Sequence, residues 1–276
     1  MSIEQILVLA IVQGLTEFLP VSSSGHLLLI PVFTGWPDQG IVTDVMVHVG
    51  SLFAVIVYFW RDVLMLGHGG LDLARGRVTQ RSRLFTYIML ATIPALAFGA
   101  FLKFSGTSAA IRGPLVVAWG AVIFGLAMYL ADRFGAKTKT MGDMHLRPAL
   151  LIGLAQAVAL IPGTSRSGIT MTAARAMGFE RGEAARFSFL LGIPAITAAG
   201  LFTALEAYES GDAIPPDALL AACFSFFSAL AAIALLMALV KRTTLTVFVV
   251  YRLILALILF AMIYGWFPDW LPPLAA

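Results

Sequence analysis

Long apolar runs divide this chain into segments that fit a membrane. A helix needs ~20 residues to cross a hydrocarbon core of ~30 Å. Six runs meet this length, and they cover residues 43–65, 83–102, 114–132, 186–206, 217–240 and 245–267. Polar exceptions are Asp44 and His48 near one end of the first run and Arg252 inside the last. The pattern predicts six transmembrane helices.

Two further stretches are interrupted by polar residues and proline. The first predicts a helix over 3–18, a break from Pro20 to Ser24 and a short helix to about residue 33. In the second, the apolar run 149–161 ends at Pro162-Gly163, and a short helix over 168–178 follows. The run 149–161 would extend only ~20 Å as a helix, which is too short to span. Each stretch therefore predicts a re-entrant hairpin of two half-helices, enclosed by protein or a wet cavity.

The two breaks resemble each other at a constant spacing. Residues that match at 143 positions apart are Gln13 with Gln156, Ser22 with Ser165, and Gly25 with Gly168. Each half of the chain then holds one hairpin and three spans, and three crossings make the second hairpin enter from the opposite face. We expect an all-α integral membrane protein with an inverted repeat, and with the breaks near the midplane. Repeat 1 covers about 1–133 and repeat 2 about 147–270, within a single membrane domain over 1–276.

Composition supports a membrane protein and sets its orientation. The chain is 60% hydrophobic and 12% charged, whereas soluble domains are about half apolar and a quarter charged. Its net charge of +3 does not indicate nucleic-acid binding, because the basic residues cluster between the apolar runs. One set of connections holds Arg75, Arg77, Arg81, Arg83, Arg133, Lys137, Lys139, Arg147, Arg181, Arg186, Lys241 and Arg242.

The other set of connections is acidic. It contains Asp38, Lys103, Arg112, Glu206, Glu209, Asp212, Asp217 and Asp269. The positive-inside rule places the basic set in the cytoplasm, so both termini are expected outside.

The polar breaks offer groups that bind an oxyanion. Serines at a helix start cap the helix, and the N–H groups of the first turn favour a negative charge. Arg166 adds a planar guanidinium that suits phosphate oxygens. The candidate diphosphate-binding residues are Ser22, Ser24, Thr164, Ser165, Ser167 and Gly168. Together they predict a site for a multiply charged oxyanion such as a diphosphate.

Glu17 and His26 add reactivity to the first break. Glu17 follows Gln13 by four residues, so both lie on one helix face. A carboxylate at membrane depth could ligate a divalent cation, act as a base, or hold a histidine or arginine in place. His26 can move a proton near neutral pH, and a serine beside a base, such as Ser23, can be a nucleophile.

Structural interpretations remain open for each residue alone. Hydroxyls in membrane helices often serve packing, and Glu17 could be only the ion-pair partner of Arg166. His26 could be a satisfied buried histidine. Arg252 is expected to pair with Glu17 or Asp44 or to extend to the membrane surface, and His48 is expected at the rim. Packing alone does not account for the repetition of the whole pattern.

At these residues the chain resembles the bacterial undecaprenyl-pyrophosphate phosphatase family of the bacitracin-resistance type. The resemblance rests on Gln13, Glu17 and the run Pro20 to His26, and on the run Pro162 to Gly168. It implies a multi-pass protein of the bacterial plasma (inner) membrane that hydrolyses undecaprenyl diphosphate to the monophosphate and phosphate. This reaction recycles the carrier lipid for peptidoglycan synthesis, and bacitracin competes for the same lipid.

The resemblance also implies roles for individual residues. Glu17, Ser23, His26 and Arg166 become the catalytic candidates, with Ser23 or a metal-held water as the nucleophile. A divalent cation, magnesium or calcium, would be held by Glu17 with Gln13. Gln13 stands where the family motif also admits glutamate, and a neutral amide is a poorer metal ligand.

Two other classes of function are alternatives to a phosphatase. A transporter or flippase of an anionic lipid or small anion would use an inverted-repeat cavity of this kind. Phosphate release by purified protein in detergent, which has no two compartments, would distinguish an enzyme. A non-catalytic scaffold would leave the paired breaks without a role. A homodimer is compatible with the sequence.

Overall fold

The computed structural model describes residues 1–37, 39–107, 113–209 and 215–266 of the chain. Within them the secondary structure is helical apart from an isolated bridge between Lys139 and Phe179. The helices are α1 (Ile3–Phe18), α2 (Ser23–Thr34), α3 (Gly40–Tyr58), α4 (Trp60–Ala74), α5 (Gln80–Phe104), α6 (Pro114–Phe134), η1 (Met141–Asp143), α7 (Leu146–Val158), α8 (Arg166–Ala176), α9 (Arg181–Glu209), α10 (Pro216–Arg242) and α11 (Thr246–Ile263). The expected all-α class is confirmed.

Five of the described helices, α5, α6, α9, α10 and α11, are long and apolar enough to cross a membrane. The sixth predicted span, 43–65, is wrong as a single helix, because α3 and α4 meet at Phe59 with a bend of 87°. Counted as one broken span, this pair brings the number to six. The protein is therefore a multi-pass membrane protein by the length and composition of its helices.

Tertiary contacts explain the bend at Phe59. The Phe59 ring is buried against Phe189 of α9, with ring centroids 5.8 Å apart. Asp62, just after the bend, pairs with Arg186 of α9. Farther along α4, Gly69 lies so close to α5 that a Cβ there would come within 2.4 Å of the Arg81 carbonyl oxygen. These contacts hold α4 along α5. The hydropathy of the sequence alone does not indicate such contacts, so it does not predict the bend.

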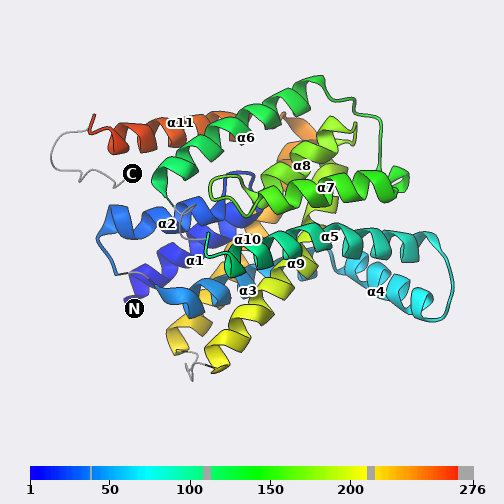
Figure 1. The fold of residues 1–276 in the computed structure, drawn as a ribbon, viewed down its shortest axis with the longest axis horizontal. Coiled ribbons are helices and arrows are strands. Elements are labelled where there is room, and N and C mark those ends of the chain that lie inside the picture. The colour runs from blue at the N-terminus through cyan, green and yellow to red at the C-terminus, as the bar shows by residue number, and fades with distance from the viewer. Residues whose placement is uncertain (38, 108–112, 210–214, 267–276) are drawn as a thin grey trace.

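Both helix–break–helix segments occur where the sequence predicts them. α1 and α2 flank the first break, and α7 and α8 flank the second. α1 packs on α10 and α7 packs on α5 (Figure 1). Glycines allow both approaches, because a Cβ at Gly14 would come within 2.6 Å of Ala229 N, and one at Gly153 within 2.3 Å of Ala91 O. Each first half-helix is thus held against a long helix.

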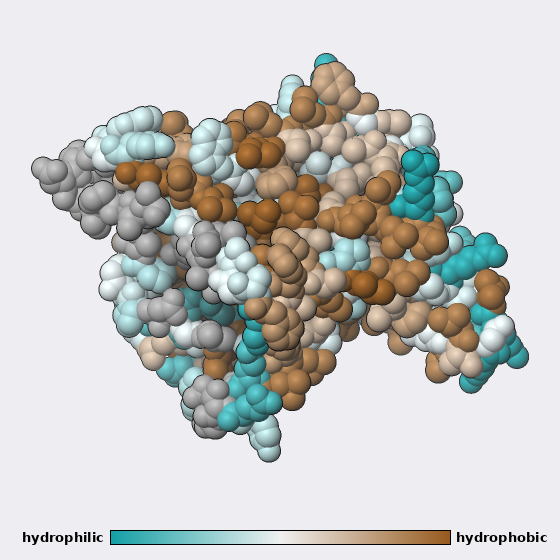
Figure 2. All heavy atoms as spheres, viewed as in Figure 1, coloured by the Kyte–Doolittle hydropathy of each residue, from teal (hydrophilic) through white to brown (hydrophobic). Residues whose placement is uncertain are grey.

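Apolar side chains cover the middle of the molecule, while hydrophilic side chains gather at the end where α4, α5 and α7 meet (Figure 2). Ile93, Ile123 and Leu257, on three of the long helices, are all more than half exposed. Such exposure is expected where lipid replaces water. Four charged residues used to assign the orientation, Asp38, Arg112, Asp212 and Asp269, lie outside the described residues, as does the end of the predicted span 245–267.

Candidate active site at the two helix breaks

The two breaks share an unusual backbone conformation. Ser22 precedes α2 with φ of 79°, and Ser165 precedes α8 with φ of 70°. Among the described residues they are the only non-glycine residues with positive φ. This region costs a residue with a side chain on the order of 1–2 kcal/mol, so the surrounding structure must enforce it. Both turns direct the chain abruptly into a helix whose first-turn N–H groups face the break.

Serine hydroxyls repeat at the two breaks as well. Ser22 Oγ lies 3.4 Å from Ser24 Oγ, and Ser165 Oγ lies 3.3 Å from Ser167 Oγ. Ser165 also caps α8, because its Oγ accepts a hydrogen bond of 3.1 Å from Gly168 N. The six residues predicted to bind a diphosphate therefore lie at the starts of α2 and α8.

Glu17 is the centre of the polar network. Its carboxylate is only 7% exposed. Ser23 Oγ donates to Oε2 at 2.7 Å and Gln13 Nε2 donates to the same oxygen at 3.1 Å. Arg166 Nη2, from the second break, donates to Oε1 at 3.2 Å. His48 Nε2 lies 3.6 Å from Oε2. The structure thus brings together Glu17, Ser23 and Arg166, as the sequence predicts.

A second set of contacts joins the breaks through backbone carbonyls. Ser167 Oγ lies 3.2 Å from the carbonyl oxygens of both Glu17 and Leu19. The guanidinium of Arg166 also donates from Nη1 to the Ser188 carbonyl of α9 at 3.2 Å. Its Nε is buried and has no hydrogen-bond partner among the described residues. The Nε of Arg166 is therefore a donor that no described residue uses.

The Arg166 guanidinium lies flat against α9 at a glycine. A Cβ at Gly192 would come within 2.0 Å of Nη1 and 2.6 Å of Cζ. Only a residue without a side chain leaves room for the guanidinium here. Gly192 is therefore part of what positions Arg166, although its sequence context carries no polar signal.

His26 lies on the more accessible side of the first break. Its Nδ1 is 2.7 Å from the Ser22 carbonyl oxygen, which only accepts, so Nδ1 carries a proton. Its Nε2 lies 2.6 Å from the Tyr251 hydroxyl, and the two rings stack with centroids 5.7 Å apart. Ser24 is exposed, and Ser23 and His26 are partly exposed. This edge connects the buried carboxylate with the surroundings.

Arg252 does not pair with Glu17 or Asp44 and does not reach the surface, so that expectation is wrong. Its side chain is 1% exposed and donates to five backbone carbonyls. The acceptors are Pro20 at 3.4 Å and Thr164 at 2.9 Å from Nη1, Gly163 at 2.8 Å and Gly120 at 2.9 Å from Nη2, and Ala121 at 3.2 Å from Nε. Broken helices leave carbonyls without partners, and the five donors of a guanidinium satisfy them.

His48 is partly exposed, which is compatible with the rim position that we expected. Its Nε2 also lies near Glu17, a contact that the sequence did not indicate, while Nδ1 donates to the Asp44 carbonyl at 2.6 Å. The sequence feature that could have indicated this contact is the position of His48, a polar residue inside an apolar run. Because α3 packs against α1, a polar residue on α3 meets the carboxylate.

Glu17 and Gln13 carry the side-chain oxygens that would hold a divalent cation. The Gln13 Oε1 atom is buried and has no hydrogen-bond partner among the described residues, and the Glu17 carboxylate lies beside its amide group. The described chain contains no cluster of three or more His, Cys, Asp or Glu residues that could hold a metal. Magnesium is usually held by one or two carboxylates together with substrate phosphates. Two protein oxygens would therefore serve as ligands, and the substrate phosphates would supply the others.

Comparisons with known proteins relate this chain to one family. A family model described as bacitracin resistance protein BacA matches residues 6–258. An undecaprenyl-diphosphatase of Roseobacter denitrificans is 49% identical over 267 residues, covering 96% of this chain and 100% of the relative. One of Ruegeria pomeroyi, with the same name, is 50% identical over 268 residues, with the same coverages of 96% and 100%. A third, of Chromohalobacter salexigens, is 47% identical over 256 residues, covering 92% of this chain and 96% of the relative.

Proposed function

This chain belongs to the family of the bacitracin resistance protein BacA, and we propose that it is an undecaprenyl-diphosphatase of the bacterial plasma membrane. It hydrolyses undecaprenyl diphosphate to the monophosphate and inorganic phosphate. The reaction returns the carrier lipid to cell-wall synthesis, and it removes the diphosphate form for which bacitracin competes. The observation that carries the proposal is the contact of Ser23 Oγ with Glu17 Oε2, beside an arginine from the second break.

Ser23 is the nucleophile in this proposal. Glu17 Oε2 accepts the Ser23 proton at 2.7 Å while Oγ attacks the terminal phosphorus. The bond from phosphorus to the bridging oxygen breaks, and the lipid monophosphate leaves. Water then cleaves the phosphoserine and releases phosphate. Trapping phosphoserine at Ser23 tests this route, and its absence during full turnover would favour direct attack by water.

Arg166 and the two helix starts stabilise the transferred phosphoryl group. Charge spreads over the three equatorial oxygens during transfer, and fixed donors aimed at those oxygens lower the barrier. Arg166 offers its unpaired Nε, and the first turns of α2 and α8 offer backbone N–H groups. Thr164 Oγ1, which is buried and unpartnered among the described residues, is a further donor at the second break.

His26 moves a proton at the accessible edge. With a proton on Nδ1 held by the Ser22 carbonyl, Nε2 is the atom that exchanges a proton with Tyr251 or water. This edge is where the leaving phosphate oxygen and the hydrolytic water exchange protons.

A divalent cation, magnesium or calcium, would be held by Glu17 and Gln13 together with the substrate phosphates. When bound, it neutralises part of the diphosphate charge. The residues themselves bind and orient the lipid headgroup. Phosphate release from purified protein in detergent, with and without a chelator, tests both the enzyme and the cation: we expect release without a chelator and loss with it.

We also propose an inverted repeat within a single membrane domain. Three observations support it: the positive φ of Ser22 and Ser165, the paired serines two residues apart at each break, and the packing of α1 on α10 and of α7 on α5. In this proposal the positive-inside rule assigns the basic connections to the cytoplasm and both termini to the outside.

Such a repeat also favours a second candidate function, transport of an anionic lipid. Detergent-solubilised protein has no compartments, so phosphate release there separates catalysis from transport.

A further inference from the structure

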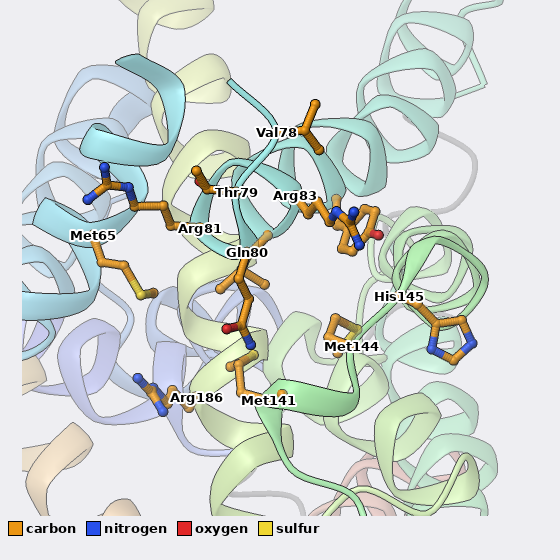
Figure 3. Close-up of a pocket in the computed structure, with 13 residues that line it drawn as sticks. Met65, Val78, Thr79, Gln80, Arg81, Arg83, Met141, Met144, His145 and Arg186 are labelled. Atoms are coloured by element: carbon orange, nitrogen blue, oxygen red, sulfur yellow. The ribbon is translucent and has the colours of Figure 1, made fainter. Parts of the chain in front are cut away.

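A cavity lies away from the helix breaks. It has a volume of about 930 Å³ and is framed by α4, the start of α5, η1 with the start of α7, and Arg186 of α9 (Figure 3). None of the residues proposed to bind the diphosphate lines it. The connections that frame it are those with the excess of arginine and lysine.

The cavity carries unneutralised positive charge. Arg81 is paired with Asp72 and Arg186 with Asp62 and Glu183, so these arginines are occupied. Arg83 has no ion-pair partner among the described residues. It lies on the same side of the cavity as Met144 and His145 (Figure 3).

The start of α7 reinforces this charge. Its N-cap residue, His145, makes no side-chain capping bond, and Pro148 has no N–H, so the open first-turn donors of α7 are the N–H groups of Leu146 and Arg147. The nearest carboxylate on this loop, Asp143, accepts from the backbone N and the hydroxyl of Thr140. Arg83 and His145, the N-cap residue of α7, both line the cavity.

The remaining wall of the cavity is apolar. Leu84 and Met144 are buried, and Met65, Tyr87 and Met141 are partly exposed. At the edge, Val78 is 70% exposed, so the apolar wall continues onto the outer surface. A free phosphate ion would leave this wall uncovered, whereas an amphiphile with an anionic head and an acyl chain would cover both parts.

We propose that this cavity binds the headgroup of an anionic phospholipid, of the phosphatidylglycerol class, from the adjacent leaflet. The phosphate lies against Arg83 and the open start of α7, and one acyl chain lies along Met65, Leu84 and Tyr87. Basic pockets between membrane helices on the cytoplasmic side recognise acidic lipid headgroups in this way. The proposal is independent of the phosphatase activity, because it uses none of that site's residues.

The test uses the full-length protein, delipidated in a non-ionic detergent. Native mass spectrometry follows titration with phosphatidylglycerol, phosphatidylcholine, undecaprenyl monophosphate and inorganic phosphate in separate arms. We expect one phosphatidylglycerol per chain, bound about tenfold more tightly than phosphatidylcholine. Arg83→Gln weakens this binding about tenfold. The control Arg242→Gln, an exposed arginine that does not line the cavity, leaves it unchanged.

A second variant tests the apolar wall without removing charge. Met141→Trp fills the cavity and is expected to reduce lipid binding while phosphate release stays normal. It also replaces Arg83→Gln if that variant fails to fold. Equal binding of phosphatidylglycerol and phosphatidylcholine would overturn the proposal. Competition by inorganic phosphate as strong as that by phosphatidylglycerol would also overturn it. Tighter binding of undecaprenyl monophosphate than of phosphatidylglycerol would overturn it too, and would assign the cavity to the reaction product.

Discussion

Arg166 Nη2 lies 3.2 Å from Glu17 Oε1, so an ion pair between residues 149 positions apart in the chain joins the two helix breaks. Ser23 donates to the other oxygen of the same carboxylate. The proposed nucleophile, its proton acceptor and the proposed phosphate-binding arginine therefore meet at one place. An ion pair alone would satisfy a structural role. The proposed phosphoryl transfer uses, in addition, the serine hydroxyl at 2.7 Å and the unpaired Nε of Arg166.

Gly192→Ala is expected to reduce phosphate release by about a hundredfold, because a shift of about 1 Å in a positioned group has this effect. The added methyl group would occupy the space of Arg166 Nη1 and displace the guanidinium. Gly200→Ala on the same helix is the control, since its Cβ would meet only Val49 Cγ2 at 3.9 Å. Steady-state rates with undecaprenyl diphosphate measure the effect. Equal rates for both variants would show that Arg166 does not act from this position.

Arg252→Met is expected to lower the free energy of unfolding by about 2–4 kcal/mol, because buried carbonyls of both breaks lose their donor. The methionine side chain supplies similar length without a hydrogen bond. Thermal unfolding in detergent measures the change, with Arg242→Gln as an exposed arginine control. An unfolding temperature like that of the unmodified protein would contradict the role of Arg252 as a tether of the breaks.

Ser22→Gly and Ser165→Gly are expected to change the free energy of unfolding by different amounts or in opposite directions. Both substitutions relieve the backbone strain of a positive φ. Ser22 makes no capping bond, so glycine there relieves strain and raises stability by about 1 kcal/mol. Ser165 caps α8 through Gly168 N, so its loss offsets the relief. Parallel unfolding curves compare the two variants. A clear loss of stability for Ser22→Gly would show that its backbone is not strained.

Gln13→Glu is expected to lower the magnesium concentration needed for half-maximal activity by about tenfold, because a second carboxylate binds the cation more strongly than an amide. The measurement is reactivation after treatment with a chelator. Gln5→Glu, two turns earlier on α1, is the control and should not change the titration. If the chelator leaves activity intact, the cation has no part in the reaction.

The sequence predicts the helix breaks because prolines, glycines and serines interrupt apolar runs at Pro20 and Pro162. It predicts the convergence of Glu17 and Arg166 because the pattern repeats at a fixed offset. It does not predict the bend at Phe59, which depends on contacts with Phe189 and Arg186 of α9.

The role of Arg252 escapes the sequence for a different reason. Its partners are backbone carbonyls, which carry no side-chain signal, so a search for carboxylate partners misses them. His48 reaches Glu17 only because α3 packs against α1. In both residues, a polar group inside an apolar run marked a buried contact but did not identify its partner.

The most direct test of the account is phosphate release from undecaprenyl diphosphate by Ser23→Ala in detergent, compared with the unmodified protein and with Ser105→Ala, an exposed serine. We predict rapid release by the unmodified protein and by Ser105→Ala, and a loss of at least about a thousandfold for folded Ser23→Ala. Release by Ser23→Ala within a few-fold of the unmodified protein would contradict the claim that the Ser23 hydroxyl beside Glu17 performs the reaction.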